Sequence, residues 1–481
     1  QRRLPGGRLA IALAFVATAI APGLLLLRLG VASPDWPADP RENRRPNLVL
    51  LTIDTLRADA VNHVTGAWPA PGIDRRVVTN TWANSSWTRP AMASFFSGVV
   101  PTGHGADGER APSTDVAWFV EDLRAAGYRT MAVVSNPHLR RRFGFDRGFS
   151  LYEHHGELEW LEPIARSFWA EWWLERFGGE SDDATADRLV PRAEAVLDRH
   201  AHGGPWLLWV HLMDPHIPYN LRGRDGAARD EDPGAWIDPL RPAMDGDFFD
   251  ALWPTREGTA VTTPEARAAL RRLYQTEVDY ALHWSARLLR EAARASGTRD
   301  MLWVMTSDHG EEFWDDGGYE HGHTLHPSVT EVPLWIGGTR SVDGANAPRR
   351  LIDVGPWLLE EVGVAGTSPR AGSGLLAEDV DLAPFALGRA EATREILAEG
   401  TLYGPPRTWL RWPDGATAAR RDDTRAVELG ASAVDTVDAG ERAKALFIQL
   451  DLWRERNASK GRAVDLSPDL VRQLRAIGYV Q

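Results

Sequence analysis

The sequence lacks cysteine altogether over its 481 residues. Disulfide bonds, thiolate metal sites and cysteine nucleophiles are therefore excluded. Lysine is almost absent as well, because the only two, Lys444 and Lys460, lie near the C-terminus. The body of the chain therefore has no lysine that could act as a nucleophile or grip a phosphate group.

Basic side chains are fewer than acidic ones. The chain has 54 basic and 67 acidic side chains, which gives a formal net charge of −13. Because such a chain is a poor candidate for coating nucleic acid, we expect no nucleic-acid partner. Hydrophobic residues make up 43% and charged residues 25%, as in an ordinary globular protein, which excludes a disordered chain, a collagen and a polytopic membrane protein. At about 150 residues per domain the length predicts roughly three units, and one large α/β domain with a smaller partner fits equally well.

One long apolar run is present, at residues 9–27, which carry no charge and lie between Arg8 and Arg28. About 20 apolar residues suffice to span a bilayer, and a basic flank followed by an apolar stretch is also typical of a signal peptide. A buried core helix is the third interpretation. We favour an uncleaved anchor over residues 1–32, followed by a linker at 33–45. Arginine before the run then places the rest of the chain outside the cytoplasm, in the periplasm or the extracellular space.

Apolar runs that are typical of buried parallel strands recur along the body of the chain and alternate with helical stretches such as residues 264–295. This alternation predicts an α/β fold with a doubly wound, mostly parallel sheet. The predicted strands are residues 47–54, 128–136, 206–214, 301–308 and 332–338.

Two segments interrupt this alternation. Residues 157–177 carry four tryptophans on a predicted helix, for which a cap on the core is favoured over a membrane-interface helix or a substrate wall. Residues 220–263 are rich in Pro, Gly and Asp and predict a long surface insertion, and their place directly after a site strand suggests a lid.

Polar side chains follow several predicted strands. Asp54, Asp214 and the pair Asp308 and His309 each stand at a strand end, where ligands bind in such folds. Thr88 stands two residues before Pro90, at the predicted start of a helix, where an anion or an alkoxide is favoured. Each feature alone also has a purely structural explanation. Thr88 before Pro90, for example, could be only a helix N-cap. Together, oxygens from Asp54, Asp308 and Thr88 with one imidazole nitrogen predict a site for a divalent cation.

The same residues carry a resemblance. The chain, from about residue 45 to its end, resembles the sulfatase family of the alkaline phosphatase superfamily. This resemblance implies an alkaline-phosphatase-like catalytic domain over residues 46–388, and a C-terminal part over 389–481 with a small antiparallel subdomain and a tail helix. The motifs that carry it are residues 45–59, 88–98, 101–105, 214–219, 306–312, 322–325, 352–356 and 474–479.

The departures from the family pattern bear on the chemistry. Sulfatases hold a Cys or Ser that is converted to formylglycine where this chain has Thr88, and Met92 replaces the family's arginine four residues later. Thr55 replaces a second aspartate, and Asn136 and His138 stand where the family has a Lys-x-His pair. Formylglycine hydrate has a second hydroxyl that can expel sulfate, whereas threonine has one. An ester formed on Thr88 must therefore be cleaved at its central atom, which favours phosphate over sulfate esters.

Phosphoryl-transferring relatives use such a threonine: nucleotide phosphodiesterases, phosphoethanolamine transferases and lipoteichoic acid synthases. The resemblance implies that Thr88 is the catalytic nucleophile and binds, with Asp54, Asp308 and His309, one divalent cation, either Mn²⁺, Mg²⁺, Ca²⁺ or Zn²⁺. His216 and His323 have two interpretations. Either they bind a second cation together with Asp214, or they hold the anion and protonate the leaving oxygen.

We expect Arg89, Asn136, His138 and Asp214 to contact substrate, although Arg89 could equally point outward. The favoured function is a metal-dependent hydrolase of phosphate or sulfate esters, with phosphoesters and phosphodiesters preferred. One alternative is a membrane-linked transferase of phosphoethanolamine or phosphoglycerol type, and another is a non-catalytic protein that binds anions. The substrate would be a small-molecule, glycan or lipid ester, the membrane contact would be the N-terminal segment, and the oligomeric state is left open.

Overall fold

The computed structural model describes the core of the chain and several short C-terminal strands. The predicted anchor, the Trp-rich segment, the proline-rich insertion and the predicted tail helix lie outside the described residues, and the domain boundaries stay predictions. In the part that is described, no helix is both long and apolar enough to cross a membrane. The described ranges are 44–62, 64, 74–107, 110–155, 185–217, 219, 264–339, 348, 350–367, 396–399, 407–411, 417–421, 427–429, 451 and 461–463.

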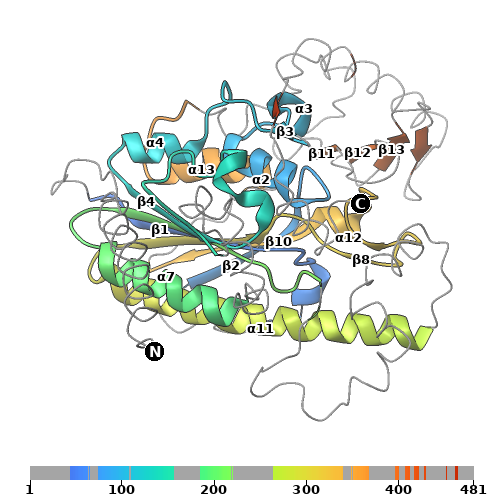
Figure 1. Ribbon diagram of the computed structural model, residues 1–481, viewed down its shortest axis with the longest axis horizontal. Coiled ribbons are helices and arrows are strands. Elements are labelled where there is room, and N and C mark those ends of the chain that lie inside the picture. Colours follow the sequence, from blue (N-terminus) through green and yellow to red (C-terminus); the bar gives the residue numbers. More distant parts are fainter. Residues whose placement is uncertain are drawn as a thin grey trace, which may run out of the picture. The chain divides into compact units, whose positions relative to one another are not determined.

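A seven-stranded sheet forms the centre of the fold, in the order β2-β10-β7-β1-β6-β4-β5 (Figure 1). Strands β7, β1, β6, β4 and β5 run parallel to one another, whereas β10 is antiparallel to both β7 and β2. The mostly parallel sheet confirms the predicted fold class. The strands are β1 (Asn47–Ile53), β2 (Asp74–Trp82), β4 (Arg129–Val134), β5 (Leu151–His154), β6 (Trp206–Leu212), β7 (Met301–Ser307) and β10 (Glu331–Gly338).

The three central strands are buried along their whole length, as their continuous apolar sequences predict. Their register places Ile53 of β1 opposite Leu212 of β6 and Ser307 of β7. The residues that follow these strands therefore start from the same edge of the sheet, which brings Asp54 and Asp308 together.

Helices cover both faces of the sheet (Figure 1). α7 (Ala186–His200) and α11 (Pro264–Ser296) lie on one face, and α2 (Thr88–Ser97), α4 (Phe119–Ala125) and α13 (Val354–Glu361) lie on the other. This arrangement is the doubly wound architecture that the sequence predicts. Shorter elements are η1 (Asp59–Val61), α3 (Pro101–His104), β3 (Arg110–Ala111), η2 (Pro137–Leu139), η3 (Arg141–Phe143), β8 (Glu312–Phe313), β9 (Tyr319–Glu320), α12 (Pro327–Thr330), η5 (Leu351–Asp353) and β15 (Arg462–Ala463).

A second sheet near the C-terminus is small and antiparallel, in the order β11-β12-β13-β14. It confirms that the C-terminal part contains such a sheet. Its strands are β11 (Ile396–Glu399), β12 (Arg407–Arg411), β13 (Thr417–Arg421) and β14 (Val427–Leu429).

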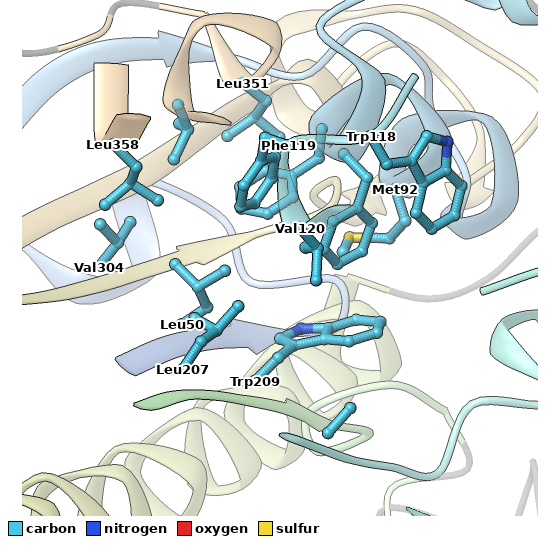
Figure 2. Packing of buried hydrophobic residues seen from close by; sticks show 14 of the residues in the cluster. Leu50, Met92, Trp118, Phe119, Val120, Leu207, Trp209, Val304, Leu351 and Leu358 are labelled. Carbon is cyan, nitrogen blue, oxygen red and sulfur yellow. The ribbon is translucent and has the colours of Figure 1, made fainter. Parts of the chain in front are cut away.

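The hydrophobic core between the sheet and α2, α4 and α13 is rich in aromatic rings (Figure 2). The ring of Phe96 stacks on Trp118 at 5.0 Å and meets the ring of Trp209 edge-on at 4.7 Å. All ten residues of α2 are buried, so this helix is held inside the protein by its packing. Met92 of α2 is 0% exposed and belongs to the same cluster.

We predict that Met92→Arg, which restores the family's residue, destabilises this chain. Met92 is buried in the hydrophobic cluster, and an unpaired buried charge costs about 3–5 kcal/mol. Urea unfolding measures the change in the free energy of unfolding. Met92→Leu is the matched control, because volume-conserving apolar exchanges cost less than about 1.5 kcal/mol. Equal stability of the arginine variant and the wild type would contradict this description of the core.

Candidate active site

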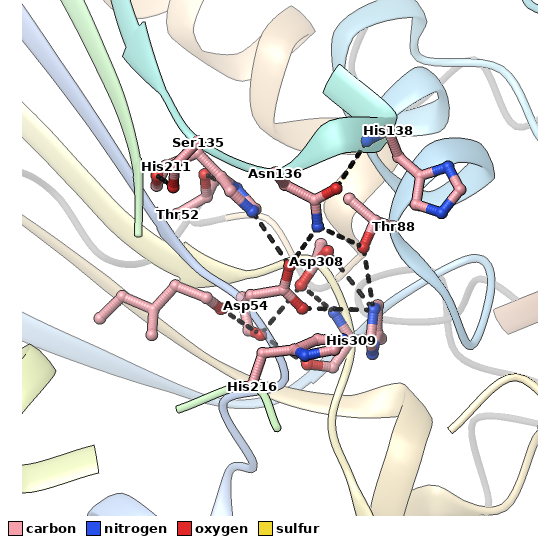
Figure 3. A network of polar contacts seen from close by, with 12 residues as sticks. Thr52, Asp54, Thr88, Ser135, Asn136, His138, His211, His216, Asp308 and His309 are labelled. Atoms are coloured by element: carbon pink, nitrogen blue, oxygen red, sulfur yellow. Dashed lines mark hydrogen bonds and ion pairs between the residues drawn. The ribbon is translucent and has the colours of Figure 1, made fainter. Parts of the chain in front are cut away.

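Four side chains predicted to hold a cation meet at the carboxyl edge of the central sheet (Figure 3). Asp54 follows β1, Asp308 and His309 follow β7, and Thr88 is the first residue of α2. Each of the four is 0% exposed. One ligand atom from each of Asp54, Asp308 and His309 lies within 4.8 Å of the others.

The turn after β1 is fixed by contacts to β7. Thr55 adopts a left-handed backbone conformation with φ 54°, which is unusual for a β-branched residue and turns the chain sharply after Asp54. The Ser307 hydroxyl accepts from the Leu56 amide at 2.9 Å, and its oxygen lies 2.6 Å from the Ile53 carbonyl oxygen and 2.5 Å from the His309 carbonyl oxygen, which share its single proton. These hydrogen bonds join the ends of β1 and β7, and so they set the separation of Asp54 and Asp308.

The His309 ring is oriented by its own backbone neighbourhood. Its Nδ1 donates to the Gly310 carbonyl at 2.9 Å, so the neutral ring presents the lone pair of Nε2 to the site. Nε2 lies 3.4 Å from Thr88 Oγ1, 3.4 Å from Asp308 Oδ2 and 3.6 Å from Asp54 Oδ1. Three oxygens and one nitrogen lone pair thus face one point, as the ligands of a cation do.

One oxygen of each carboxylate takes hydrogen bonds and the other does not. Asp54 Oδ2 accepts from Asn136 Nδ2 at 2.6 Å and from His211 Nε2 at 3.2 Å, and Asp308 Oδ1 accepts from the His309 amide at 2.9 Å. Asp54 Oδ1 and Asp308 Oδ2 are buried and accept no hydrogen bond from any described residue. Leaving two buried carboxylate oxygens without donors is costly, and a divalent cation between them removes that cost. The residues present therefore fit a metal ion.

The electrostatics of the two carboxylates agree with this fit. Burial alone would raise the pKa of Asp54, but the neighbouring His216, the hydrogen bond from His211 and the His309 ring together lower it below its usual range. Burial and the charge of Asp54 raise the pKa of Asp308. The two carboxylates thus repel each other across a dry space, which a bound cation would relieve.

Thr88 and Asn136 contact each other beside these carboxylates. Asn136 Nδ2 donates to Thr88 Oγ1 at 3.2 Å, and Asn136 Oδ1 accepts from the His138 amide at 2.8 Å. The second bond fixes the amide so that its NH₂ group faces Thr88 and Asp54. The predicted Asn136 is thereby in contact with the predicted nucleophile.

Arg89 points into the protein and is 0% exposed. Its guanidinium donates to the Asp107 carbonyl at 2.7 Å and to His138 Nδ1 at 2.8 Å, and it lies 3.7 Å above the Phe143 ring. Because arginine only donates, a neutral His138 carries its proton on Nε2. Burial and the Arg89 charge hold the pKa of His138 well below its usual range, so the ring stays neutral. In the structure Arg89 thus contacts His138, another of the four residues predicted to contact substrate.

The remaining predicted residues are distributed around the cluster. The rings of His216 and His321 lie 5.0 Å apart, and those of His321 and His309 lie 4.4 Å apart. His323 Nε2 contacts Glu312 Oε2 at 2.8 Å. Asp214 Oδ2 accepts from the Ala186 amide at 2.8 Å, at the start of α7.

Two histidines of the site were not assigned a role from the sequence. His321 lies beside His309, and its Nδ1 contacts Glu311 Oε1 at 2.9 Å. It stands in the polar segment 320–323, but the sequence does not distinguish it from His323 two residues later. His211 contacts Asp54 from within β6, where its buried position suggests only a core residue. The register of β6 against β1 is the observation that could have identified it.

Comparisons with known proteins agree with this geometry. A family model described as Sulfatase matches residues 46–362. The low-salt glycan biosynthesis sulfotransferase Agl7 of Haloferax volcanii is 23% identical over 326 residues, which are 66% of this chain and 61% of that relative. The chain thus spans about three fifths of the length of this curated relative.

Solved structures share the fold over almost their whole length. The phosphonate monoester hydrolase of Silicibacter pomeroyi has a TM-score of 0.58 and 19% identity, covering 88% of this chain and 98% of its own. A 2-O GAG sulfatase has a TM-score of 0.55 and 14% identity, covering 89% and 96%. The family model covers more than half of the sequence and includes every residue of the cluster described above, so the chain belongs to the sulfatase family.

Proposed function

We propose that the chain is a metal-dependent hydrolase of phosphate or sulfate esters that uses Thr88 as its nucleophile and prefers phosphoesters and phosphodiesters. The observation that carries this proposal is the position of Thr88 Oγ1, which lies 3.4 Å from His309 Nε2 within the group formed with Asp54 and Asp308. A threonine hydroxyl is almost never ionised at neutral pH, so a nucleophilic threonine needs such surroundings.

Asp54, Asp308, His309 and Thr88 would hold one divalent cation, for which Mn²⁺, Mg²⁺, Ca²⁺ and Zn²⁺ all suit the donor set. When bound, it would lower the pKa of the Thr88 hydroxyl and offset negative charge on the reacting group. Asp54 and Asp308 are oriented for this role by the backbone and side-chain hydrogen bonds that occupy their other oxygens.

The reaction has two steps. Thr88 Oγ1 loses its proton to water and attacks phosphorus; an Oγ1–P bond forms and the bond from phosphorus to the leaving oxygen breaks. Water then attacks phosphorus, the Oγ1–P bond breaks, and a proton from the attacking water passes to Oγ1, which restores the Thr88 hydroxyl. Asn136 Nδ2, which already donates to Oγ1, is placed to donate to an oxygen of the phosphoryl group, and the N-terminus of α2 favours an anion there.

The leaving oxygen needs a proton, and imidazole is the side chain suited to supply it at neutral pH. The His321 ring lies beside His309 and the His216 ring lies beside His321, and Glu311 holds His321 through its Nδ1. We assign the acid role to this pair. His323, paired with Glu312, and Asp214, which contacts the start of α7, then support the surrounding loops.

Phosphorus is favoured over sulfur for a chemical reason. The single hydroxyl of Thr88 requires attack at the central atom of the ester intermediate. Asn136 stands beside Thr88 where the family has a lysine, so the group that donates to Oγ1 is neutral. A neutral donor suits the single negative charge of a phosphodiester or a phosphonate monoester better than the double charge of a phosphate monoester. A sulfate monoester is also singly charged, so the preference for phosphorus over sulfur rests on the single hydroxyl of Thr88.

Transfer to an alcohol instead of water is the second candidate. The relative from Haloferax volcanii carries the name of a sulfotransferase, and the apolar run at residues 9–27 would place the site next to lipid-linked acceptors outside the cytoplasm. A non-catalytic anion-binding protein is less favoured, because such a protein has no need to bury two carboxylates against a nucleophile position. Assays with water alone and with glycerol or ethanolamine as acceptor separate hydrolase from transferase.

We predict that Thr88→Ala lowers kcat by about a thousand-fold or more, because the substitution removes the hydroxyl that would form the covalent intermediate. Metal content and the far-UV circular dichroism spectrum should stay close to those of the wild type. Thr88→Ser, which keeps the hydroxyl, is the matched variant and should retain measurable turnover. Full activity of the alanine variant would rule out the mechanism.

The second prediction concerns the substrate. Aryl phosphodiesters and aryl phosphonate monoesters should be hydrolysed with a higher kcat/KM than aryl sulfates with the same leaving group. When the leaving group is the same, a difference in kcat/KM reflects the central atom of the ester, which is phosphorus or sulfur. If sulfates are the better substrates across the panel, the preference for phosphorus is wrong, although the site and the nucleophile could still stand.

Metal binding is the third prediction. Elemental analysis of the purified chain should find one divalent cation, lost in Asp54→Asn and in Asp308→Asn but kept in Asp214→Asn, the matched control at a neighbouring strand end. Because the pKa of Asp308 is raised, protons compete with the cation at a higher pH than for an exposed aspartate, so affinity should fall as the pH is lowered. Unchanged affinity for the cation in both Asp54→Asn and Asp308→Asn would refute this cation site.

A further inference from the structure

A chain of buried hydrogen bonds runs from the hydrophobic core to Asp54. Trp209 Nε1 donates to Thr52 Oγ1 at 3.0 Å, Thr52 Oγ1 lies 2.8 Å from His211 Nδ1, and His211 Nε2 lies 3.2 Å from Asp54 Oδ2. Trp209 and His211 are 0% exposed and Thr52 is 1% exposed, so water does not compete for these contacts. The residues come from adjacent strands, because β1 and β6 pair with Thr52 opposite His211.

The direction of each hydrogen bond follows from donor chemistry. The Trp209 indole can only donate, so Thr52 Oγ1 accepts there and its own proton is free for another acceptor. His211 Nδ1 is that acceptor, since the Val210 carbonyl is much farther from Thr52 Oγ1, at 3.5 Å. A neutral His211 then carries its proton on Nε2, which faces Asp54. The indole therefore sets the tautomer of a ring two hydrogen bonds away.

The direction of the hydrogen bond from His211 determines how the Asp54 carboxylate is held. Its Oδ2 receives one N–H from His211 and a second from Asn136, while Oδ1 faces His309 and Asp308. With Oδ2 occupied by two donors, the carboxyl plane is fixed and Oδ1 is left for a cation. The opposite tautomer of His211 would place a lone pair against Oδ2 and repel it.

The start of the chain is also fixed. The Trp209 ring packs against Phe96 at 4.7 Å and stacks on Phe149 at 5.6 Å, so packing of the core sets the position of Nε1. We propose that Trp209, Thr52 and His211 form a positioning relay, which holds Asp54 in the orientation that binds the cation. The relay rests on the cation site proposed above, and its members do not touch the reacting atoms.

The first test is Thr52→Val, which keeps the shape of the side chain and removes the hydroxyl. The full chain, stripped with a chelator, is titrated with Mn²⁺ and with Zn²⁺. We expect the Kd for each cation to rise about 10–100-fold, the range for loss of a group that orients a metal ligand. Thr52→Ser keeps the hydroxyl and should bind within about threefold of the wild type.

Thr306→Val is the matched control. Thr306 lies opposite Thr52 in the register of β7 and is 1% exposed, but its hydroxyl donates to the Pro333 carbonyl at 2.8 Å, away from Asp54. The Thr306→Val substitution also removes a threonine hydroxyl at the same level of the sheet, and it should leave the Kd for each cation within about threefold of the wild type. A Thr52→Val variant with wild-type affinity, or a Thr306→Val variant that loses as much as Thr52→Val, would overturn the relay.

A second pair of variants tests the relay even if Thr52→Val does not fold. His211→Gln can place an amide N–H near the former Nε2, whereas the shorter His211→Asn reaches only the Nδ1 position. We expect the glutamine variant to bind each cation more tightly than the asparagine variant, and the reverse order would contradict the relay. Nitrogen-15 NMR of histidine-labelled protein should show His211, assigned by its loss in these variants, as the Nε2–H tautomer.

The cation site itself is tested separately by Asp54→Asn. If the wild type binds and Asp54→Asn does not, an unchanged Kd in Thr52→Val refutes the relay alone. If the wild type binds neither cation, or binds both equally well in Asp54→Asn, the proposed site fails and the relay fails with it.

Discussion

The site depends on the repulsion between two buried carboxylates. Asp54 and Asp308 face each other with one oxygen each that no described donor contacts, and the His309 lone pair points between them. Such an arrangement is unfavourable without a cation and favourable with one. The sheet enforces it, because β1 pairs in parallel with β7 and the Ser307 hydroxyl joins the two strand ends. The fold thus supplies the free energy that keeps the two charges together.

Much of this could be predicted from the sequence. Continuous apolar runs identified β1, β6 and β7, and an acid at the end of each run indicated a shared edge. The antiparallel direction of β10 could not be predicted, since an apolar run has the same appearance in either direction. His211 could not be assigned because burial alone does not reveal a partner on another strand. His321 and His323 stand two residues apart, and only three-dimensional contacts separate them.

The substitutions from the family pattern support one another. Met92 fills the core where the family has an arginine, and Asn136 donates a neutral N–H to Thr88 where the family has a lysine. The one arginine next to Thr88, Arg89, is turned inward and fixes His138 as a neutral donor. Two cationic groups of the family pattern are thus replaced by uncharged side chains, at positions 92 and 136. The proposed nucleophile Thr88 belongs to the same set of changes, because an ester on its single hydroxyl would have to be cleaved at the central atom.

The position of Asp54 is set by residues from several strands of the sheet. Asp54 accepts hydrogen bonds from His211 on β6 and from Asn136 after β4, and it faces Asp308 after β7. The two donors come from neighbouring strands, so the register of the sheet places them around Asp54. The geometry of the proposed cation site therefore depends on the packing of the strands and of the hydrophobic core. Because Trp209 belongs to both, a substitution in the aromatic core is felt at Asp54 before the fold is lost.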